Sequence, residues 1–340
     1  MNLLGFSRKK SWGKAAILLS VSAMVTGLYV LGLQDTNVAR VCVDIPDSER
    51  HAVSTPETEN SHVPPQDVIA KTPYEDVSYT QVKVSTSKQL RQVFDDYDYT
   101  LTVPEGKEVL EVPRLELVSL PGDLDKVGKN DKKSLFLRTH LPLILKTNER
   151  IQKDREKLLA LVEMQENGFH LRNKDIKWMT ELAKKYGLNV LNIKELVRRV
   201  DVIPPSLALG QAVAEAGWGV SYAAKRKNST FGMMRRSSNQ VQSYGSLQEC
   251  VDDYVRNLNC HPAYKKMREI RATQRKCNEE VCSLKLADGL HQYSTRGKSY
   301  IREVKQLIVN NDLKQYDGAQ LQHAKRSTPL SENPIHKSNA

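Results

Sequence analysis

The stretch PPSLALGQAVAEAGWGVS, residues 204–221, decides the fold. Its two leading prolines favour the start of a helix, because proline is well tolerated in the first helical turn. The residues from Ser206 to Ala216 are good helix formers apart from Gly210, and a Gly-Trp-Gly sequence then ends the run. The pattern predicts a helix with Glu215 in its last turn.

Glu215 is the residue in this helix with the most chemical interest. One and two turns back lie Gln211 and either Leu207 or Ala208, so the carboxylate shares a stripe with small and apolar residues at the negative end of the helix. Both conditions disfavour the ionised form, and burial against Trp218 would raise the pKa further, as a general acid near neutral pH requires. A glutamate near a helix end is more often solvated, and that alternative stays open.

The amino-acid composition excludes several classes of protein. The chain has 340 residues with 39% hydrophobic side chains, so it is not wholly disordered, and its formal net charge of +11 favours polysaccharide, membrane surface or nucleic acid as surroundings. Five cysteines are too few for a disulfide-dense scaffold, and neither a HExxH nor a CxxC pair occurs. We expect no metal and no cofactor.

The amino terminus predicts the compartment. Residues 1–14 are a basic flank, expected to be cytoplasmic, and the uncharged run 15–33 is long enough for one transmembrane helix. Residues 34–78, rich in proline and polar side chains, are expected to form a disordered stalk. These features predict a single-pass protein of the inner membrane with its catalytic part in the periplasm. The alternative is a cleaved signal peptide.

The rest of the chain divides into three parts. Residues 79–130 mix alternating and helical apolar spacing and predict a small mixed subdomain. Residues 131–315 are helical in character, with a kink expected at Pro142, and form the predicted catalytic domain. Residues 316–340 are polar and are expected to be a disordered tail.

Four of the cysteines lie close together in the sequence. Cys250 and Cys260 are expected to share a helix, too far apart to bond to each other. In an oxidising compartment, the simplest local pairing is between Cys277 and Cys282.

The helix 204–221 and several later phrases together resemble a known family, the Bax-like proteins of the glucosaminidase family (glycoside hydrolase family 73, mannosyl-glycoprotein endo-beta-N-acetylglucosaminidase-like). The resemblance covers about residues 80–312, with its core at 198–312. The phrases that carry it are Arg198–Pro204, Gln211–Ser221, Asn228–Gly232, Tyr244–Leu247, His261–Tyr264, and Leu290–Gly297 with Tyr300.

The resemblance implies a mainly α, α+β fold: a lysozyme-like helical lobe with a short β-hairpin lobe across a sugar-binding cleft. It implies a glycoside hydrolase of the endo-β-N-acetylglucosaminidase type, with Glu215 as the general acid and Tyr293 lining the cleft near the cleaved sugar. Substrate-binding roles are implied for five further residues: Gln211, Trp218, Ser221, Asn228 and Phe231. The two aromatic residues among them have an alternative explanation as core residues, which is the commoner role of buried aromatic side chains.

The chain departs from the family pattern where a second carboxylate is expected. The segment Met233–Ser243 contains neither Asp nor Glu. Glu249 is the nearest candidate for a second catalytic group, yet Ser246 and Glu249 have the spacing of a capping box. Asp252 and Asp253 are expected to face solvent. A single acid suffices if the N-acetyl group of the substrate acts as the nucleophile.

These observations predict a peptidoglycan hydrolase that cleaves N-acetylglucosaminyl β-1,4 linkages in the bacterial cell wall. Its expected partners are peptidoglycan glycan strands and, through residues 15–33, the inner membrane. The alternative is a catalytically weak or inactive glycan-binding scaffold of the envelope. Nucleic-acid binding is disfavoured, because the basic residues are scattered among acidic ones along amphipathic helices.

Overall fold

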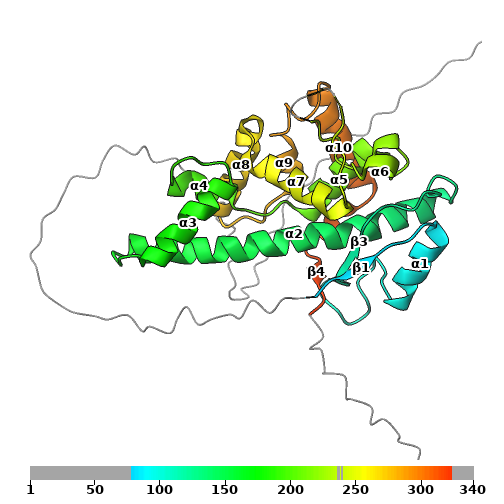
Figure 1. Ribbon diagram of the computed structural model, residues 1–340, viewed down its shortest axis with the longest axis horizontal. Helices are drawn as coiled ribbons and strands as arrows, with labels where there is room; N and C mark the ends of the chain where they lie inside the picture. Colours follow the sequence, from blue (N-terminus) through cyan, green and yellow to red (C-terminus); the bar gives the residue numbers. More distant parts are fainter. Residues whose placement is uncertain (1–77, 236–237, 239, 324–340) are drawn as a thin grey trace, which may run out of the picture. The chain divides into compact units, whose positions relative to one another are not determined.

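The computed structural model describes residues 78–235, 238 and 240–323 (Figure 1). Within this part of the chain, no helix is both long and apolar enough to cross a membrane. The predicted transmembrane segment 15–33, its basic flank 1–14 and nearly all of the predicted stalk lie outside the described residues.

The long helix α2 (Lys129–Glu166) organises the described part of the chain. Figure 1 shows α2 between the mixed segment, with α1, β1 and β3, and the later helices on its other side. It continues through Pro142 as one helix. Proline removes one backbone hydrogen bond, but every residue from Leu135 to Leu145 is buried, so packing on all sides holds this turn.

The segment before α2 is a small α+β arrangement. It contains β1 (Thr80–Val82), α1 (Ser87–Asp96), β2 (Glu111–Val112) and β3 (Leu115–Leu117), and β1 pairs in parallel with β3. Helix α1 starts at a complete capping box formed by Thr86 with Gln89. The helix and strands predicted here from the apolar spacing are therefore confirmed.

The helix that opened the sequence analysis is α5 (Pro205–Ala216), and it lies at the centre of the helical part. It is in contact with α2, α10, α9 and the 3₁₀ helix η2, and its residues from Pro205 to Val213 are all buried. The remaining helices are α3 (Asn173–Lys185), α4 (Ile193–Arg199), α6 (Tyr222–Lys227), α7 (Leu247–Cys260), η1 (Pro262–Tyr264), α8 (Lys265–Lys276), α9 (Ser283–Ala287), α10 (Lys298–Asn310) and η2 (Leu313–Tyr316).

The chain stays ordered beyond Tyr316, where the sequence predicted the start of a disordered tail. Strand β4 (Gln320–Leu321) pairs in parallel with β2, and Ala319 is buried. Asp317 accepts hydrogen bonds from the backbone N–H and the hydroxyl of Ser206, at 2.8 and 2.7 Å, and so satisfies the first turn of α5. The predicted boundary at 316 is wrong, because these long-range contacts hold the polar segment.

Of the expected hairpin lobe, the described residues show a short antiparallel pairing. In the described residues after Gly232, an isolated antiparallel bridge joins Met234 to Val241. Two further backbone bonds support it, from Arg235 N–H to the Gln240 carbonyl at 2.8 Å and from Gln242 N–H to the Met233 carbonyl at 2.7 Å.

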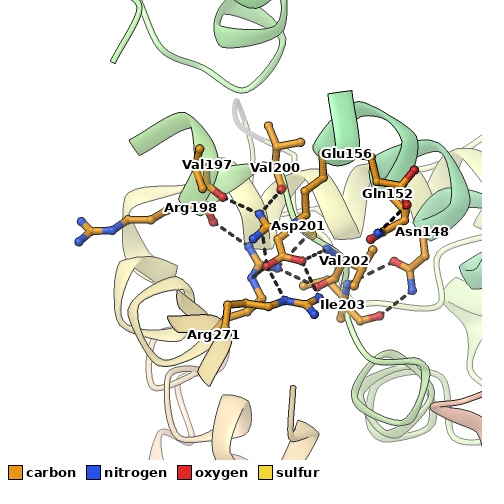
Figure 2. A network of polar contacts seen from close by, with 12 residues as sticks. Asn148, Gln152, Glu156, Val197, Arg198, Val200, Asp201, Val202, Ile203 and Arg271 are labelled. Carbon is orange, nitrogen blue, oxygen red and sulfur yellow. Dashed lines mark hydrogen bonds and ion pairs between the residues drawn. The ribbon is translucent and has the colours of Figure 1, made fainter. Parts of the chain in front are cut away.

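A buried ionic cluster fixes the segment that leads into α5. Asp201, 2% exposed, pairs with Arg275 at 3.0 Å, Arg155 at 3.5 Å and the fully buried Arg271 at 3.6 Å. Figure 2 shows Arg271 also donating to backbone carbonyls of this segment, which include that of Val202 at 2.9 Å. The cluster links α2 and α8 to the start of α5 and so positions the helix that carries Glu215.

The pairing of the cysteines differs from the expected one. Cys250 and Cys260 do share α7, and both are free. Cys282 is also free, so the predicted pairing of Cys277 with Cys282 is wrong.

Candidate active site

Glu215 lies in the last turn of α5, directly before a backbone turn of left-handed conformation. Gly217, Trp218 and Gly219 all have positive φ, at 56, 62 and 83°. A Cβ at residue 219 would lie 2.8 Å from side-chain atoms of Leu120, so only glycine allows the turn to pack this closely against the core. The turn ends α5 at a fixed place and thereby fixes the position of the acid.

Gly232 brings a second backbone segment against the carboxylate. This residue has a φ of 62°, and a Cβ built on it would lie 2.5 Å from Glu215 Oε2. Both the conformation and the lack of space require glycine here. The Asn-x-x-Phe-Gly phrase of the sequence is therefore the segment that faces the acid.

A buried chain of polar groups holds the other side of Glu215. The hydroxyl of Tyr300 interacts with the Glu215 carboxylate, and the same hydroxyl accepts a hydrogen bond from Gln211 Nε2 at 3.1 Å. Gln211 Oε1 in turn accepts from the hydroxyl of Tyr254 at 2.8 Å. Gln211, predicted to bind substrate, is fully buried and instead positions Tyr300.

The surroundings of Glu215 favour its protonated form. Burial raises the pKa of the carboxyl above its ordinary value, and the negative charge of Glu303 raises it further. The hydrogen bond from Tyr300 and the positive charge of Arg296 act in the opposite direction without cancelling the effect of burial. A carboxyl group that keeps its proton to higher pH can act as a general acid.

A cleft of about 1230 Å³ opens beside this acid. Gly232, which lies against the Glu215 carboxylate, and its neighbour Phe231 belong to the lining of this cleft, whereas Glu215 itself does not. The other lining residues come mainly from the end of α3, the turn after Gly232, α7 and η1: Lys184, Lys185, Gly187, Met233, Met234, Arg235, Gln242, Tyr244, Glu249, Asp253, Arg256, Asn257, Cys260, His261, Pro262, Tyr264 and Tyr293.

Tyr293 and Phe231 adjoin each other at the cleft lining. The Tyr293 hydroxyl donates to the Phe231 carbonyl at 2.7 Å, and its ring stacks on Tyr300 at 5.4 Å. The Phe231 ring is fully buried and stacks on Tyr254 at 4.0 Å. Tyr293 lies at the cleft as expected, but its hydroxyl holds the backbone beside Gly232.

The other three predicted substrate-binding residues have visible structural roles. The Trp218 ring packs against Phe136 of α2 and is outside the cleft lining. Ser221 is the N-cap of α6, its hydroxyl accepting from Ala224 N–H at 3.2 Å. Asn228 ends α6 with a φ of 48° and donates to the carbonyls after residue 243. These contacts position the walls, because caps and packing fix where α6 begins and ends.

Two carboxylates belong to the part of the cleft lining that the structure describes. Glu249 accepts a hydrogen bond from Gly245 N–H at 2.9 Å, while Ser246 caps α7 through its hydroxyl. Asp253, expected to be solvated, lines the cleft and accepts from the hydroxyl of Tyr244 at 2.8 Å and from Arg256 at 2.9 Å. Both carboxylates are therefore held by neighbours within the protein.

Sequence reasoning assigned no role to Tyr300, Arg296 or Gly232. All three occur in the phrases that carry the family resemblance, so the signal was present, but which of them touches Glu215 depends on tertiary packing. Arg296 lies 5.2 Å from the centre of the Tyr300 ring and pairs with Glu303.

Among the described residues, no group of three or more His, Cys, Asp or Glu side chains could hold a metal ion.

Comparison with known proteins shows the family of the chain. The family described as mannosyl-glycoprotein endo-beta-N-acetylglucosaminidase, or glucosaminidase, matches residues 191–313, which include α5, Tyr300 and the cleft-lining residues from Phe231 onward. The chain belongs to this family of glycosidases.

One known protein is similar to this chain over most of its own length. Protein bax of Escherichia coli is 36% identical over 198 residues, which are 54% of this chain and 70% of that protein. This chain is therefore Bax-like. The crystal structure of the catalytic domain of the autolysin Auto from Listeria monocytogenes is 21% identical and covers 41% of this chain and 81% of its own, but its TM-score of 0.27 is too low to carry an argument.

Proposed function

We propose that the chain is a peptidoglycan hydrolase that cleaves N-acetylglucosaminyl β-1,4 linkages, with Glu215 as the general acid. The observation that carries this proposal is the half-buried Glu215 carboxylate, enclosed by Gly232 and Tyr300 beside a cleft large enough for several sugar units. Membership of the glucosaminidase family supports the substrate class.

The proposed chemistry starts with proton transfer. Protonated Glu215 donates its proton to the glycosidic oxygen as the bond to the anomeric carbon breaks, and the leaving sugar departs as an alcohol. The N-acetyl group of the same N-acetylglucosamine attacks the anomeric carbon, and water then opens the cyclic intermediate while Glu215 takes back a proton. This route needs no second protein carboxylate, which fits the internal hydrogen bonds of Glu249 and Asp253.

A second function has one observation in its favour. The turn after Gly232 is short and lacks acidic residues, and the two other carboxylates at the cleft are held by neighbours. A protein that had lost the second catalytic group would keep the cleft as a glycan-binding site. It would then act as a scaffold of the cell envelope.

We also propose that residues 15–33 anchor the chain in the inner membrane with the catalytic part in the periplasm. The uncharged run after a basic flank supports this placement. Alkaline carbonate extraction of fractionated cells tests it. The full-length protein should stay with the membranes, whereas release of a shortened soluble form would identify the segment as a signal peptide.

Incubation with purified sacculi tests the hydrolase assignment. The full-length chain in mild detergent should release soluble fragments whose new reducing end is N-acetylglucosamine. Reducing-end N-acetylmuramic acid would contradict the proposed bond, and binding without any release of fragments would favour the scaffold.

A further inference from the structure

The lining of the cleft has an excess of positive charge. Among the described residues of this lining are four cations, Lys184, Lys185, Arg235 and Arg256, and the two carboxylates described above. Binding of a neutral glycan does not require an excess of cations, because sugar hydroxyls are bound mainly by hydrogen bonds and aromatic faces. The charge therefore points to a negatively charged part of the substrate.

The four cations are not equivalent. Lys185 pairs with Asp154 at 2.9 Å, and Arg256 pairs with Asp253 at 2.9 Å. Lys184 and Arg235 are exposed, and neither has an ion-pair partner among the residues that the structure describes. These two side chains are thus available to an anion in the cleft.

The size of the cleft leaves room for more than the sugar at the cleaved bond. Its volume of about 1230 Å³ exceeds the range of roughly 300 to 1,000 Å³ that is usual for small-molecule sites. Lys184 at the end of α3 and Arg235 in the turn after Gly232 come from segments about 50 residues apart, which the fold brings to one cleft. A branched, anionic polymer segment fits this arrangement.

We propose that Lys184 and Arg235 bind carboxylates of the peptide stem attached to the glycan, so that the chain acts preferentially on strands that still carry stems. This inference rests on the proposed function for its substrate. Guanidinium and ammonium groups bind carboxylates through charge-assisted hydrogen bonds, which are stronger than neutral ones. Stem recognition would select the strand while Glu215 performs the chemistry.

The test compares stem-bearing glycan strands with strands whose stems an amidase has removed. Wild-type full-length chain should show a kcat/KM about tenfold higher on the stem-bearing strands. The variants Lys184→Gln and Arg235→Gln should each reduce this ratio, and the double variant should bring it close to one. Raised salt should reduce the wild-type ratio as well, because the cations are exposed.

Matched controls separate the cleft from general charge. Lys174→Gln on α3 and Arg226→Gln on α6 remove exposed cations outside the cleft lining and should leave the ratio unchanged. Equal wild-type rates on both kinds of strand, or an unchanged ratio in the double variant, would overturn the inference.

A binding measurement keeps this test separate from the test of catalysis. Sedimentation of Glu215→Gln protein with each kind of strand should show tighter binding to the stem-bearing strands. Preferential binding by a wild-type chain that cleaves neither kind would overturn the hydrolase assignment and support stem recognition. Equal binding to both kinds would overturn stem recognition, whatever the catalytic result.

Discussion

The carboxylate of Glu215 occupies the space in which residue 232 would carry a side chain. A Cβ at Gly232 would lie 2.5 Å from Glu215 Oε2, closer than a Cβ atom approaches a non-bonded atom in real proteins. The two phrases that identify the family, one ending α5 and one following α6, therefore meet at a single contact. The close contact between the end of α5 and the segment at Gly232 therefore positions both Glu215 and this part of the cleft lining.

Gly232→Ala should abolish most of the lytic activity while the chain still folds. The added methyl group displaces the carboxylate, and misplacement of a catalytic group by about 1 Å can cost about 100-fold in rate. The left-handed backbone adds a cost of about 1 to 2 kcal/mol to folding. Lytic rate and melting temperature should be measured on the same protein.

The control for this substitution is Gly168→Ala. Gly168 also has a positive φ, at 82°, but a Cβ there has no atom within 4 Å. This variant should lose similar stability and keep its activity. An active Gly232→Ala protein would show that the contact with Glu215 does not matter for catalysis.

Glu215→Gln should leave the fold nearly intact and remove lytic activity. The amide has the same shape but cannot donate the proton, and general acid catalysis contributes typically about 100- to 10,000-fold. Zymography on embedded sacculi measures the effect. Activity within about threefold of wild type would contradict the assignment, because Ser206–Ser221 contains no other carboxylate that could replace Glu215.

The alkaline limb of the pH–rate profile should move upward in Arg296→Gln. Arg296 lowers the pKa of Glu215, so its loss raises the pH at which the acid loses its proton. Activity would then persist to higher pH. Arg302, an exposed arginine of α10, is not among the groups that shift the Glu215 pKa, so Arg302→Gln is the control and should leave the profile in place.

If the alkaline limb of the pH–rate profile stays unchanged in Arg296→Gln, the pKa that sets this limb belongs to a group other than Glu215. A kcat/KM profile from pH 4 to 9 on solubilised glycan decides between the two outcomes. The limb should be compared in both variants at the same ionic strength, because salt screens the charge of an exposed arginine.

Local signals in the sequence were sufficient for α5 and for several helix starts. The proline pair and the Gly-Trp-Gly phrase bound α5 as observed. Asn192 and Glu195 have the spacing of a helix start in the sequence, and Asn192 caps α4 by accepting from Glu195 N–H at 3.0 Å. Such signals work because capping and turn residues act on neighbours within a few positions.

Residues whose roles depend on distant partners could not be placed in this way. Gln211 resembles a cleft residue in sequence, yet Tyr254 and Tyr300 enclose it completely. Asp253 lies off the apolar stripe of α7, but a cleft borders that face and Tyr244 reaches the carboxylate. Helical periodicity separates buried from exposed positions and does not reveal which exposed face borders a site.

Asp201→Asn should destabilise the chain strongly, by about 3 to 5 kcal/mol, because Arg271 and Arg155 would remain buried without a counter-charge. Burial alone would raise the pKa of Asp201, but the three arginines bring it below its ordinary value. The contribution of Asp201 to stability is therefore present above the unfolded-state pKa of about 3.9 and is lost as the pH falls through the lower folded-state pKa.

Urea unfolding of both proteins between pH 3 and 7 tests this prediction. The difference in free energy of unfolding should be full at pH 7 and should narrow below about pH 4. Asp131→Asn is the control, because Asp131 pairs with Arg91 on the surface, where both side chains are about half exposed. A difference as small as that of the control would show that the buried cluster is not essential for folding.

The last prediction concerns the second catalytic group. If the N-acetyl group of the substrate acts as the nucleophile, Glu249→Gln and Asp253→Asn should each keep most of the lytic activity. Both substitutions keep the size of the side chain and an oxygen that can accept the observed hydrogen bonds from Gly245 and Tyr244. Ser246→Ala should instead cost about 1 kcal/mol of stability with little change in rate, because its hydroxyl caps α7.

Rates and melting temperatures of these variants distinguish a catalytic base from a structural carboxylate. A loss of orders of magnitude in turnover at unchanged stability, in Glu249→Gln or Asp253→Asn, would identify that residue as the base and exclude the single-acid route. Loss of both activity and stability in Asp253→Asn would indicate that the bond from Tyr244 holds the cleft wall. A wild-type chain that binds sacculi without cleaving them would make Glu215 a structural residue of a binding cleft and favour the scaffold.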